Sequence, residues 1–288
     1  MLAAEILKEQ KVKIVPICFE SFFFNCSLAK KSAHDLNLKL RIVDISDEHL
    51  KVIRNPRHGR GKGLNPCIDC HLLMMKKAKQ IMIKEKYDFL ATGEVLDERP
   101  FSQSKKVFRL AEEGLKLRGL ILRPLSALLL PETVPESKGW VKREDLHGIK
   151  GKPRKTQIAL AKKFKVKKFP TPSGGCILTE LDYSGKLKKL FEKVTKADGL
   201  DCQTLRRGRV FWENGFLLVV GRNEKDNQEL LKIKKKKDIV LEPDNFSGPT
   251  VLIRGFKRKI TKQIIDKGIE LLLNHSKKIP QEIIIKVN

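Results

Sequence analysis

The first 125 residues alternate between short apolar runs and amphipathic segments, and this alternation restricts the fold more than any other feature of the chain. The apolar runs cover residues 12–19, 38–43, 89–92 and 120–123. Segments with helical spacing cover residues 2–11, 27–36, 47–53, 70–84 and 102–118. Strands that alternate with helices predict an α/β domain whose parallel sheet is covered by helices on both faces.

Beyond residue 130 the alternation stops. Residues 131–140, PETVPESKGW, form a proline-punctuated connection, and helical patterns follow at 156–164 and 187–194. Strand-like runs at 209–212 and 216–220 flank Asn214-Gly215, a pair typical of a tight β-hairpin. We therefore predict an α/β domain over 1–135, a basic connecting segment over 136–199 and a small α+β domain over 200–288.

The composition is strongly basic, because 60 Lys and Arg oppose 34 Asp and Glu and give a formal net charge of +26. Since 41% of the residues are hydrophobic, the chain can still build apolar cores, and a disordered polyelectrolyte is excluded. The excess of positive charge predicts a polyanionic partner. Nucleic acid is the first expectation, and an acidic membrane surface is the alternative.

The sequence gives no sign of export or membrane insertion. No uninterrupted apolar stretch approaches the roughly 20 residues that cross a bilayer. The opening residues, MLAAEILKEQ, lack the basic and apolar regions of a secretory signal. Six cysteines are too few for a disulfide framework, so we expect a reduced, cytoplasmic protein whose cysteines act chemically.

Two cysteine motifs are candidates for chemistry. Cys67 and Cys70 stand in NPCIDCH just before a helical segment, where the helix N-terminus would favour a thiolate. The same pair could be half of a metal site completed by His71 or a distant cysteine, or it could have no chemical role. Cys176 follows two glycines and a basic run, which also predicts a lowered thiol pKa. For the other cysteines, Cys18, Cys26 and Cys202, packing in the core is the expectation.

Two further segments could contact a ligand. Thr92, Gly93 and Glu94 follow a buried strand, where open parallel sheets bind their ligands, although an ordinary turn is the equal alternative. Residues 150–168 hold nine cations and no acidic residue, so an RNA backbone is expected to neutralise them, with a solvated helix face as the alternative. These cations are Lys150, Lys152, Arg154, Lys155, Lys162, Lys163, Lys165, Lys167 and Lys168.

Three motifs in this order, NPCIDCH, FLATGEVLDERPFSQ and FPTPSGGCILTE, resemble the PP-loop ATPases that thiolate tRNA, the 2-thiouridylase and 4-thiouridine synthase group. The tail, LLVVGRNEKDNQELL and DNFSGPTVLIRG, resembles an NFACT-R-type RNA-binding domain, in which Arg222 and Asn223 would contact tRNA. The resemblance implies an adenine-nucleotide alpha-hydrolase-like (HUP or PP-loop) domain followed by an RNA-binding module.

The implied reaction is an ATP-dependent sulfur transfer to a tRNA uridine, with Mg²⁺ accompanying ATP and a persulfide or thiocarboxylate carrier protein as the sulfur donor. By position, Cys176 resembles the persulfide carrier and Cys70 its partner. A related branch instead holds a [4Fe–4S] cluster, for which Cys67, Cys70 and Cys176 would be the ligands. Phe19, Thr92, Gly93 and Glu94 would bind the nucleotide, and Arg99, Ser102 and Gln103 the substrate or its phosphates.

Two departures from this family stand out. The chain opens at MLAAEIL, which looks like the helix after the first strand and the SGGxDS phosphate loop, and neither of these is present in the sequence. Asp97-Glu98 stand where relatives more often carry Gly-Gln. Either the true start lies upstream, or the sequence is a fragment, or the protein has lost ATP hydrolysis, and the first two explanations are favoured because the later motifs remain legible. A non-catalytic RNA-binding protein and an RNA adaptor whose cysteines hold zinc are the alternative functions.

Overall fold

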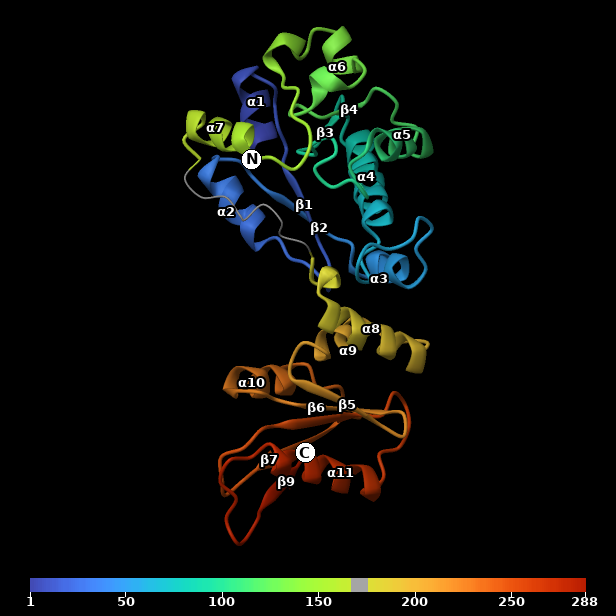
Figure 1. Cartoon of the computed structure of the whole chain (residues 1–288), viewed down its shortest axis with the longest axis vertical. Helices are drawn as coiled ribbons and strands as arrows, with labels where there is room; N and C mark the ends of the chain where they lie inside the picture. Colours follow the sequence, from blue (N-terminus) through green and yellow to red (C-terminus); the bar gives the residue numbers. More distant parts are fainter. Residues whose placement is uncertain (167–175) are drawn as a thin grey trace. The chain divides into compact units, whose positions relative to one another are not determined.

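The computed structural model describes residues 1–166 and 176–288. The chain divides into two compact units, residues 1–179 and 180–288, and each is described here by itself (Figure 1). We predicted a connecting segment over 136–199. Its residues up to 179 cluster with the N-terminal unit and the remainder with the C-terminal unit.

The N-terminal unit is a mixed α/β structure. Its helices are α1 (Leu2–Glu9), α2 (Ser27–Asp35), α3 (Ser46–Arg54), α4 (Cys67–Lys84), α5 (Lys105–Gly114), α6 (Val134–Ser137) and α7 (Lys155–Lys163). Its strands are β1 (Ile17–Glu20), β2 (Arg41–Asp44), β3 (Leu90–Ala91) and β4 (Ile121–Leu122). Each element falls within a few residues of a segment that the sequence periodicity predicts, apart from the short α6.

The strands form two separate parallel pairs and not the single parallel sheet that the alternation predicts. β1 pairs with β2 from Ile17–Arg41 to Glu20–Asp44, and β3 pairs with β4 through Leu90–Ile121 and Ala91–Leu122. Within the described residues, no strand joins β1 to β3. All four residues of β1 are half-buried and Ala91 is exposed, whereas strands of a parallel sheet are normally buried on both faces.

A cavity of about 850 Å³ lies between the two pairs. β1 and β3 both line it, together with α1 and α4, and most of the lining side chains are apolar. The apolar residues that line it include Ala3, Ala4, Ile17, Met74, Ala78 and Leu90. The two strand pairs are thus separated by an apolar space.

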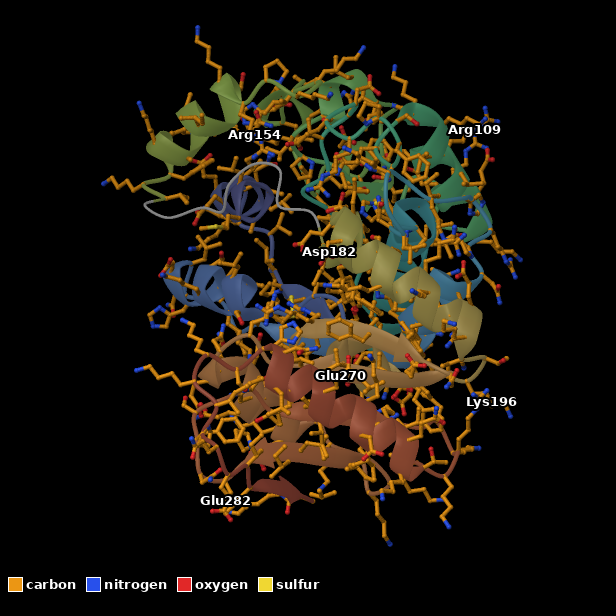
Figure 2. All side chains as sticks on the ribbon, turned by 60° about the horizontal axis from the view of Figure 1, so that its bottom comes forward. Arg109, Arg154, Asp182, Lys196, Glu270 and Glu282 are labelled. Atoms are coloured by element: carbon orange, nitrogen blue, oxygen red, sulfur yellow. A yellow bond between two sulfur atoms is a disulfide. The ribbon has the colours of Figure 1, made fainter. Side chains whose placement is uncertain are left out.

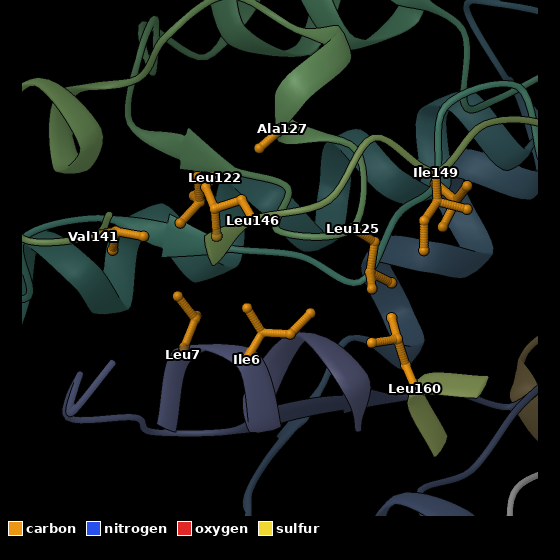
Figure 3. Close-up of a cluster of buried hydrophobic side chains, with 10 residues drawn as sticks. Ile6, Leu7, Leu122, Leu125, Ala127, Val141, Leu146, Ile149 and Leu160 are labelled. Carbon is orange, nitrogen blue, oxygen red and sulfur yellow. The ribbon is translucent and has the colours of Figure 1, made fainter. Parts of the chain in front are cut away.

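A hydrophobic cluster holds the N-terminal unit together around α1 (Figure 3). Ile6 and Leu7 of α1 pack against Leu122, which ends β4, and against Leu160 of α7. Residues between these elements complete the cluster, namely Val95, Leu125, Ala127, Val141, Leu146 and Ile149. Because α1 and α7 are far apart in sequence, this core brings the basic segment into the N-terminal unit.

The C-terminal unit is a small α+β structure with a five-stranded antiparallel sheet in the order β5-β6-β8-β7-β9 (Figure 1). The strands are β5 (Arg209–Glu213), β6 (Phe216–Val220), β7 (Ile239–Pro243), β8 (Val251–Arg254) and β9 (Ile285–Val287). The helices are α8 (Leu181–Lys193), α9 (Gly199–Thr204), α10 (Glu224–Lys232) and α11 (Lys262–Asn274).

The predicted hairpin is confirmed, because β5 and β6 pair across Asn214 and Gly215, whose φ angles are 47° and 81°. Such positive angles at both central residues match the twist of the flanking strands. On one face of the sheet α11 packs closely, since a Cβ atom at Gly268 would approach Leu241 and Ile253 within 2.8 Å. All five residues of β6 are buried, so the sheet is covered on both faces there.

The cysteine predictions had mixed outcomes. Cys202 is buried in the core, as expected. Cys18 and Cys26 form a disulfide, with Cα atoms 6.0 Å apart, where separate core packing in a reduced protein was predicted. The turn between β1 and α2 brings their side chains together, which the sequence pattern around either cysteine does not reveal. No helix among residues 1–166 and 176–288 is long and apolar enough to cross a membrane.

Candidate functional site

Three cysteine thiols gather at the start of α4. This helix begins at Cys67, one turn earlier than predicted, so Cys67 and Cys70 both lie in its first turn. Cys176 lies near both of them, since it interacts electrostatically with Cys70 and with Cys67. The backbone N–H of Leu64 donates to the carbonyl of Leu178 at 3.0 Å and ties the two segments together. The structure therefore brings together the three cysteines that the sequence singled out.

The prediction that Cys70 and Cys176 favour the thiolate form is wrong in this structure. Burial raises the pKa of the Cys70 thiol to about 12, with smaller contributions from the neighbouring Cys176, Cys67 and Asp69. Burial also raises the pKa of Cys176, although the positive charge of Arg99 opposes the change. Loss of hydration disfavours the charged sulfur more than the helix N-terminus favours it.

A metal site at these cysteines would require several ligand side chains close to one another. In the described part of the chain, no group of three or more His, Cys, Asp or Glu side chains is arranged to hold a metal ion. Since the three thiols do not form such a set, we derive no chemical step through an iron–sulfur cluster or zinc ion.

A buried polar network links the cysteine helix to the end of β3. His71 Nδ1 lies 3.1 Å from a carboxylate oxygen of Glu94, and Thr92 Oγ1 donates to the other oxygen at 3.1 Å. Arg123, which follows β4 and is 2% exposed, donates to the same oxygen as Thr92, at 3.2 Å. Burial raises the pKa of Glu94, but hydrogen bonding from His71 and the charge of Arg123 outweigh burial, so that the pKa is lowered.

Two polar residues of the site, Arg123 and Asp69, were not among the sequence predictions. Asp69 stands between Cys67 and Cys70. Arg123 could have been found as a cation at the carboxyl end of an apolar strand. Asp69 is buried and accepts from the backbone N–H of His58 at 2.9 Å, while His58 Nδ1 lies 2.7 Å from its other oxygen. These contacts hold the basic loop 55–65 against the start of α4.

All four residues predicted to bind a nucleotide line the 850 Å³ cavity, namely Phe19, Thr92, Gly93 and Glu94. His71 lines it too, one residue beyond Cys70. Glu94 is already engaged by His71 and Arg123, so its carboxylate is fixed in one orientation. Binding pockets for small ligands typically measure about 300–1,000 Å³, and this cavity is within that range.

The predicted substrate residues form a turn beside the thiols. The N–H groups of Ser102 and Gln103 donate to the carbonyl of Arg99, at 2.9 and 2.8 Å. Ser102 and Gln103 are buried, and Gln103 Oε1 has no hydrogen-bond partner among the residues described. The Arg99 charge acts on Cys176, so this turn belongs to the cysteine side of the site.

Carboxylates from other segments neutralise part of the basic run. Lys150 pairs with Asp97 at 3.5 Å, Arg154 with Glu98 at 2.6 Å, and Lys163 of α7 with Glu9 of α1 at 3.1 Å. The unusual Asp97-Glu98 pair therefore anchors the basic segment. Lys150 and Lys163 are exposed although paired, and the other exposed cations among the described residues of the run are Lys152, Lys155, Lys162 and Lys165. Lys167 and Lys168, like the Gly174-Gly175 pair, lie outside the described residues.

The predicted RNA contacts near α10 have structural partners. Arg222 donates to the Asp226 carboxylate at 2.6 Å, and the Asn223 side chain caps α10 by accepting from the Asp226 N–H at 3.0 Å. A Cβ atom at Gly221 would meet Asn227 Oδ1 at 2.0 Å, and this oxygen accepts from the Thr250 N–H. Gly221, Arg222, Asn223 and Asn227 thus build the turn between β6 and α10.

Side chains that reach away from the ribbons of both units are often tipped with nitrogen (Figure 2). The C-terminal unit carries 24 Lys and Arg against 15 Asp and Glu. Fold and charge together define this unit as a small basic α+β domain built on an antiparallel sheet.

Residues 208–288, which contain all five strands of that sheet, match the family described as the NFACT protein RNA binding domain. The chain matches no curated protein and no solved structure.

Proposed function

We propose that the protein binds RNA through its C-terminal unit. The match of residues 208–288 to an RNA-binding domain family carries this proposal, and the positive charge of the unit supports it. Tight electrostatic binding to a phosphate backbone needs such an excess of cations. The family match favours RNA over an acidic membrane surface as the polyanionic partner.

We further propose that the N-terminal unit transfers sulfur to a uridine of tRNA in a reaction that consumes ATP and Mg²⁺, in the cytoplasm. The observation that supports it is the gathering of Cys67, Cys70 and Cys176 near a cavity lined by Thr92 and Glu94. His71 links the cysteines to the cavity, because it follows Cys70 in the chain and contacts Glu94. The unit is proposed to be of the HUP or PP-loop type.

In this reaction the uridine carbonyl oxygen attacks the α-phosphorus of ATP, and pyrophosphate leaves. A persulfide on Cys176, whose outer sulfur is transferred from the persulfide of a carrier protein, attacks the activated carbon, and AMP leaves with the bonding electrons. Cys70 then attacks Cys176 Sγ, releases the thiolated uridine and leaves a Cys70–Cys176 disulfide for an external thiol to reduce. Arg99 would stabilise the Cys176 sulfur as an anion, since its charge opposes the raised pKa.

A non-catalytic RNA-binding protein is the second candidate. The specific observation in its favour is the burial of Cys70, which raises the thiol pKa to about 12 and keeps the sulfur protonated near neutral pH. The described lining of the cavity is also largely apolar, with Lys11 and Lys13 as its lysines, which is little positive charge for a triphosphate.

The modified nucleosides of tRNA from cells that lack the gene distinguish these functions. The enzyme proposal expects one thiolated uridine to disappear, to return with the wild-type gene, and to stay absent with Cys176→Ser. A matched control is Cys202→Ala, which changes a cysteine of the other unit and is expected to restore thiolation. An unchanged set of thiolated nucleosides in the deletion strain would rule out the enzyme.

A further inference from the structure

An aromatic pair projects from the sheet of the C-terminal unit. Trp212 lies in β5, and Phe256 lies just after β8. Their ring centroids are 5.8 Å apart and the ring planes differ by only 14°, so the two rings are stacked. Both side chains are half-buried, which leaves part of the stacked surface open to solvent. Neither residue belongs to the motifs that the sequence analysis selected.

One cation lies over the Trp212 ring, and three follow Phe256 in the chain. Lys193, at the end of α8, places Nζ 5.7 Å from the centre of the Trp212 ring. Lys257, Arg258 and Lys259 follow Phe256 directly and are all exposed. The one acidic neighbour in β5 is Glu213, and alternation along a strand directs its side chain to the opposite face of the sheet from Trp212.

The turn that carries Phe256 is held in place by several contacts. Phe256 and Lys257 have φ angles of 49° and 80°, a conformation that residues other than glycine rarely adopt. The N–H of Arg258 donates to the carbonyl of Gly255 at 2.9 Å, and its guanidinium donates to the carbonyl of Asn214 at 3.0 Å. Such strained backbone persists where surrounding structure fixes it, and it is concentrated at functional positions.

We propose that Trp212 and Phe256 form a platform on which an unpaired RNA base stacks, while Lys193, Lys257, Arg258 and Lys259 bind the adjoining phosphates. Aromatic rings accept any base on their faces, and unpaired nucleotides are the usual targets of such surfaces. The charge of the four cations suits a polyanion. This inference deepens the proposed RNA binding of the C-terminal unit and rests on it.

The test measures the affinity of the full chain for a fluorescently labelled single-stranded RNA of ten nucleotides and for a blunt RNA duplex of equal charge. Loss of one stacking contact is expected to weaken single-stranded binding by about 10-fold in Trp212→Leu. Trp212→Phe keeps a ring and should retain most of the affinity. Phe256→Gly removes the other ring at a position whose positive φ angle suits glycine, and its affinity should fall likewise.

Charge and stacking are separated by a matched pair of double variants. Lys257→Ala with Lys259→Ala should weaken binding and reduce the dependence on salt, whereas Lys277→Ala with Lys278→Ala removes two exposed lysines elsewhere in the unit and should have the smaller effect. Since the chain has only two tryptophans, a Trp140→Phe background isolates the Trp212 fluorescence, which bound RNA should quench.

Three results would overturn the platform while RNA binding itself survives. The first is that folded Trp212→Leu binds single-stranded RNA with wild-type affinity. The second is that Trp212→Leu loses as much affinity for duplex RNA as for single-stranded RNA. The third is that the two double lysine variants lose equal affinity. If the wild-type chain binds neither RNA, the proposed function fails together with the platform.

Discussion

At the scale of single residues, His49 of α3 is the most deeply buried titratable group with a large pKa change. Its ring is fully buried, packs edge-on against Phe23, and places Nδ1 3.0 Å from Ser21 Oγ. No hydrogen-bond partner for Nε2 exists within the described residues. Burial lowers the pKa from 6.5 to about 4, because the charged ring would lose its hydration.

This pKa predicts acid sensitivity of the N-terminal unit. The unfolded chain takes up a proton at His49 near pH 6.5 and the folded chain only near pH 4, so the stabilisation is full above pH 6.5 and is lost as the pH falls towards 4. The expected loss is about 3 kcal/mol. Thermal unfolding followed from pH 7.5 to 4 should show a smaller decline in His49→Leu. Parallel curves for the two proteins would contradict the assignment.

Arg254 of β8 is a second buried residue with a defined role. It is 1% exposed and donates to Asp238 at 2.6 Å, to Asp201 of α9 at 3.0 Å and to Thr204 at 2.8 Å. Because α9 lies outside residues 208–288, these bonds join the matched RNA-binding segment to helices that precede it.

Removal of the Arg254 charge should therefore destabilise the C-terminal unit strongly. Arg254→Met leaves Asp238 and Asp201 buried without their partner, and the expected loss in the free energy of unfolding is about 3–5 kcal/mol. Lys267→Met, which breaks an exposed pair with Glu270, should lose about 0–1 kcal/mol. Urea denaturation monitored by Trp212 fluorescence compares them, and similar midpoints for both variants would refute the role of Arg254.

At the scale of elements, β1 and β3 each keep one edge without a partner strand among the described residues, beside the 850 Å³ cavity. Exposed strand edges accept further strands, because their N–H and C=O groups lack partners. An added strand between them would join the two parallel pairs into one five-stranded sheet. Its side chains would be apolar on both faces, since α1 and α4 line the two sides of the space.

We predict that a five-residue apolar strand, fused ahead of Met1 through a short glycine-rich loop, stabilises the N-terminal unit. Each kcal/mol of added stability raises Tm by about 2–4 °C in a unit of this size, so a rise of about 5 °C or more is expected. The control replaces the second and fourth residues of the strand by Asp, which cannot be buried there. Equal Tm values for the fusion and its control would show that the cavity accepts no strand.

At the scale of the whole molecule, both units carry a positive excess, with 36 Lys and Arg against 19 Asp and Glu in residues 1–179. Ion pairs such as Arg154–Glu98 and Lys163–Glu9 reduce the charge that the basic run can offer to a ligand. Exposed cations remain in each of the two units, so each unit by itself offers positive charge to a phosphate backbone.

The affinity for tRNA should therefore fall steeply with salt. If about six phosphates are neutralised, binding is expected to weaken about 1,000-fold between 50 and 200 mM salt. Filter binding over this range measures the slope, and Lys152→Glu combined with Lys162→Glu and Lys165→Glu should reduce it. A flat salt dependence would contradict phosphate recognition, and stronger binding to anionic vesicles than to tRNA would favour a membrane partner.

The sequence by itself determined the local structure. Helical spacing placed α1, α2 and α7 within two residues of their observed bounds, and Asn214-Gly215 fixed the β5–β6 hairpin, because both signals depend on residues close together in the chain. The ordered motifs also selected Cys67, Cys70 and Cys176, which the structure brings together.

Only the tertiary structure decided the chemistry of those groups. The buried Cys70 thiol, the Glu94 network with His71 and Arg123, the Cys18–Cys26 disulfide and the division of the strands into two pairs all depend on contacts between distant segments. Burial and neighbouring charge set a pKa, and both are properties of the packed chain. A periodic pattern cannot encode them, since it records only which face of an element is apolar.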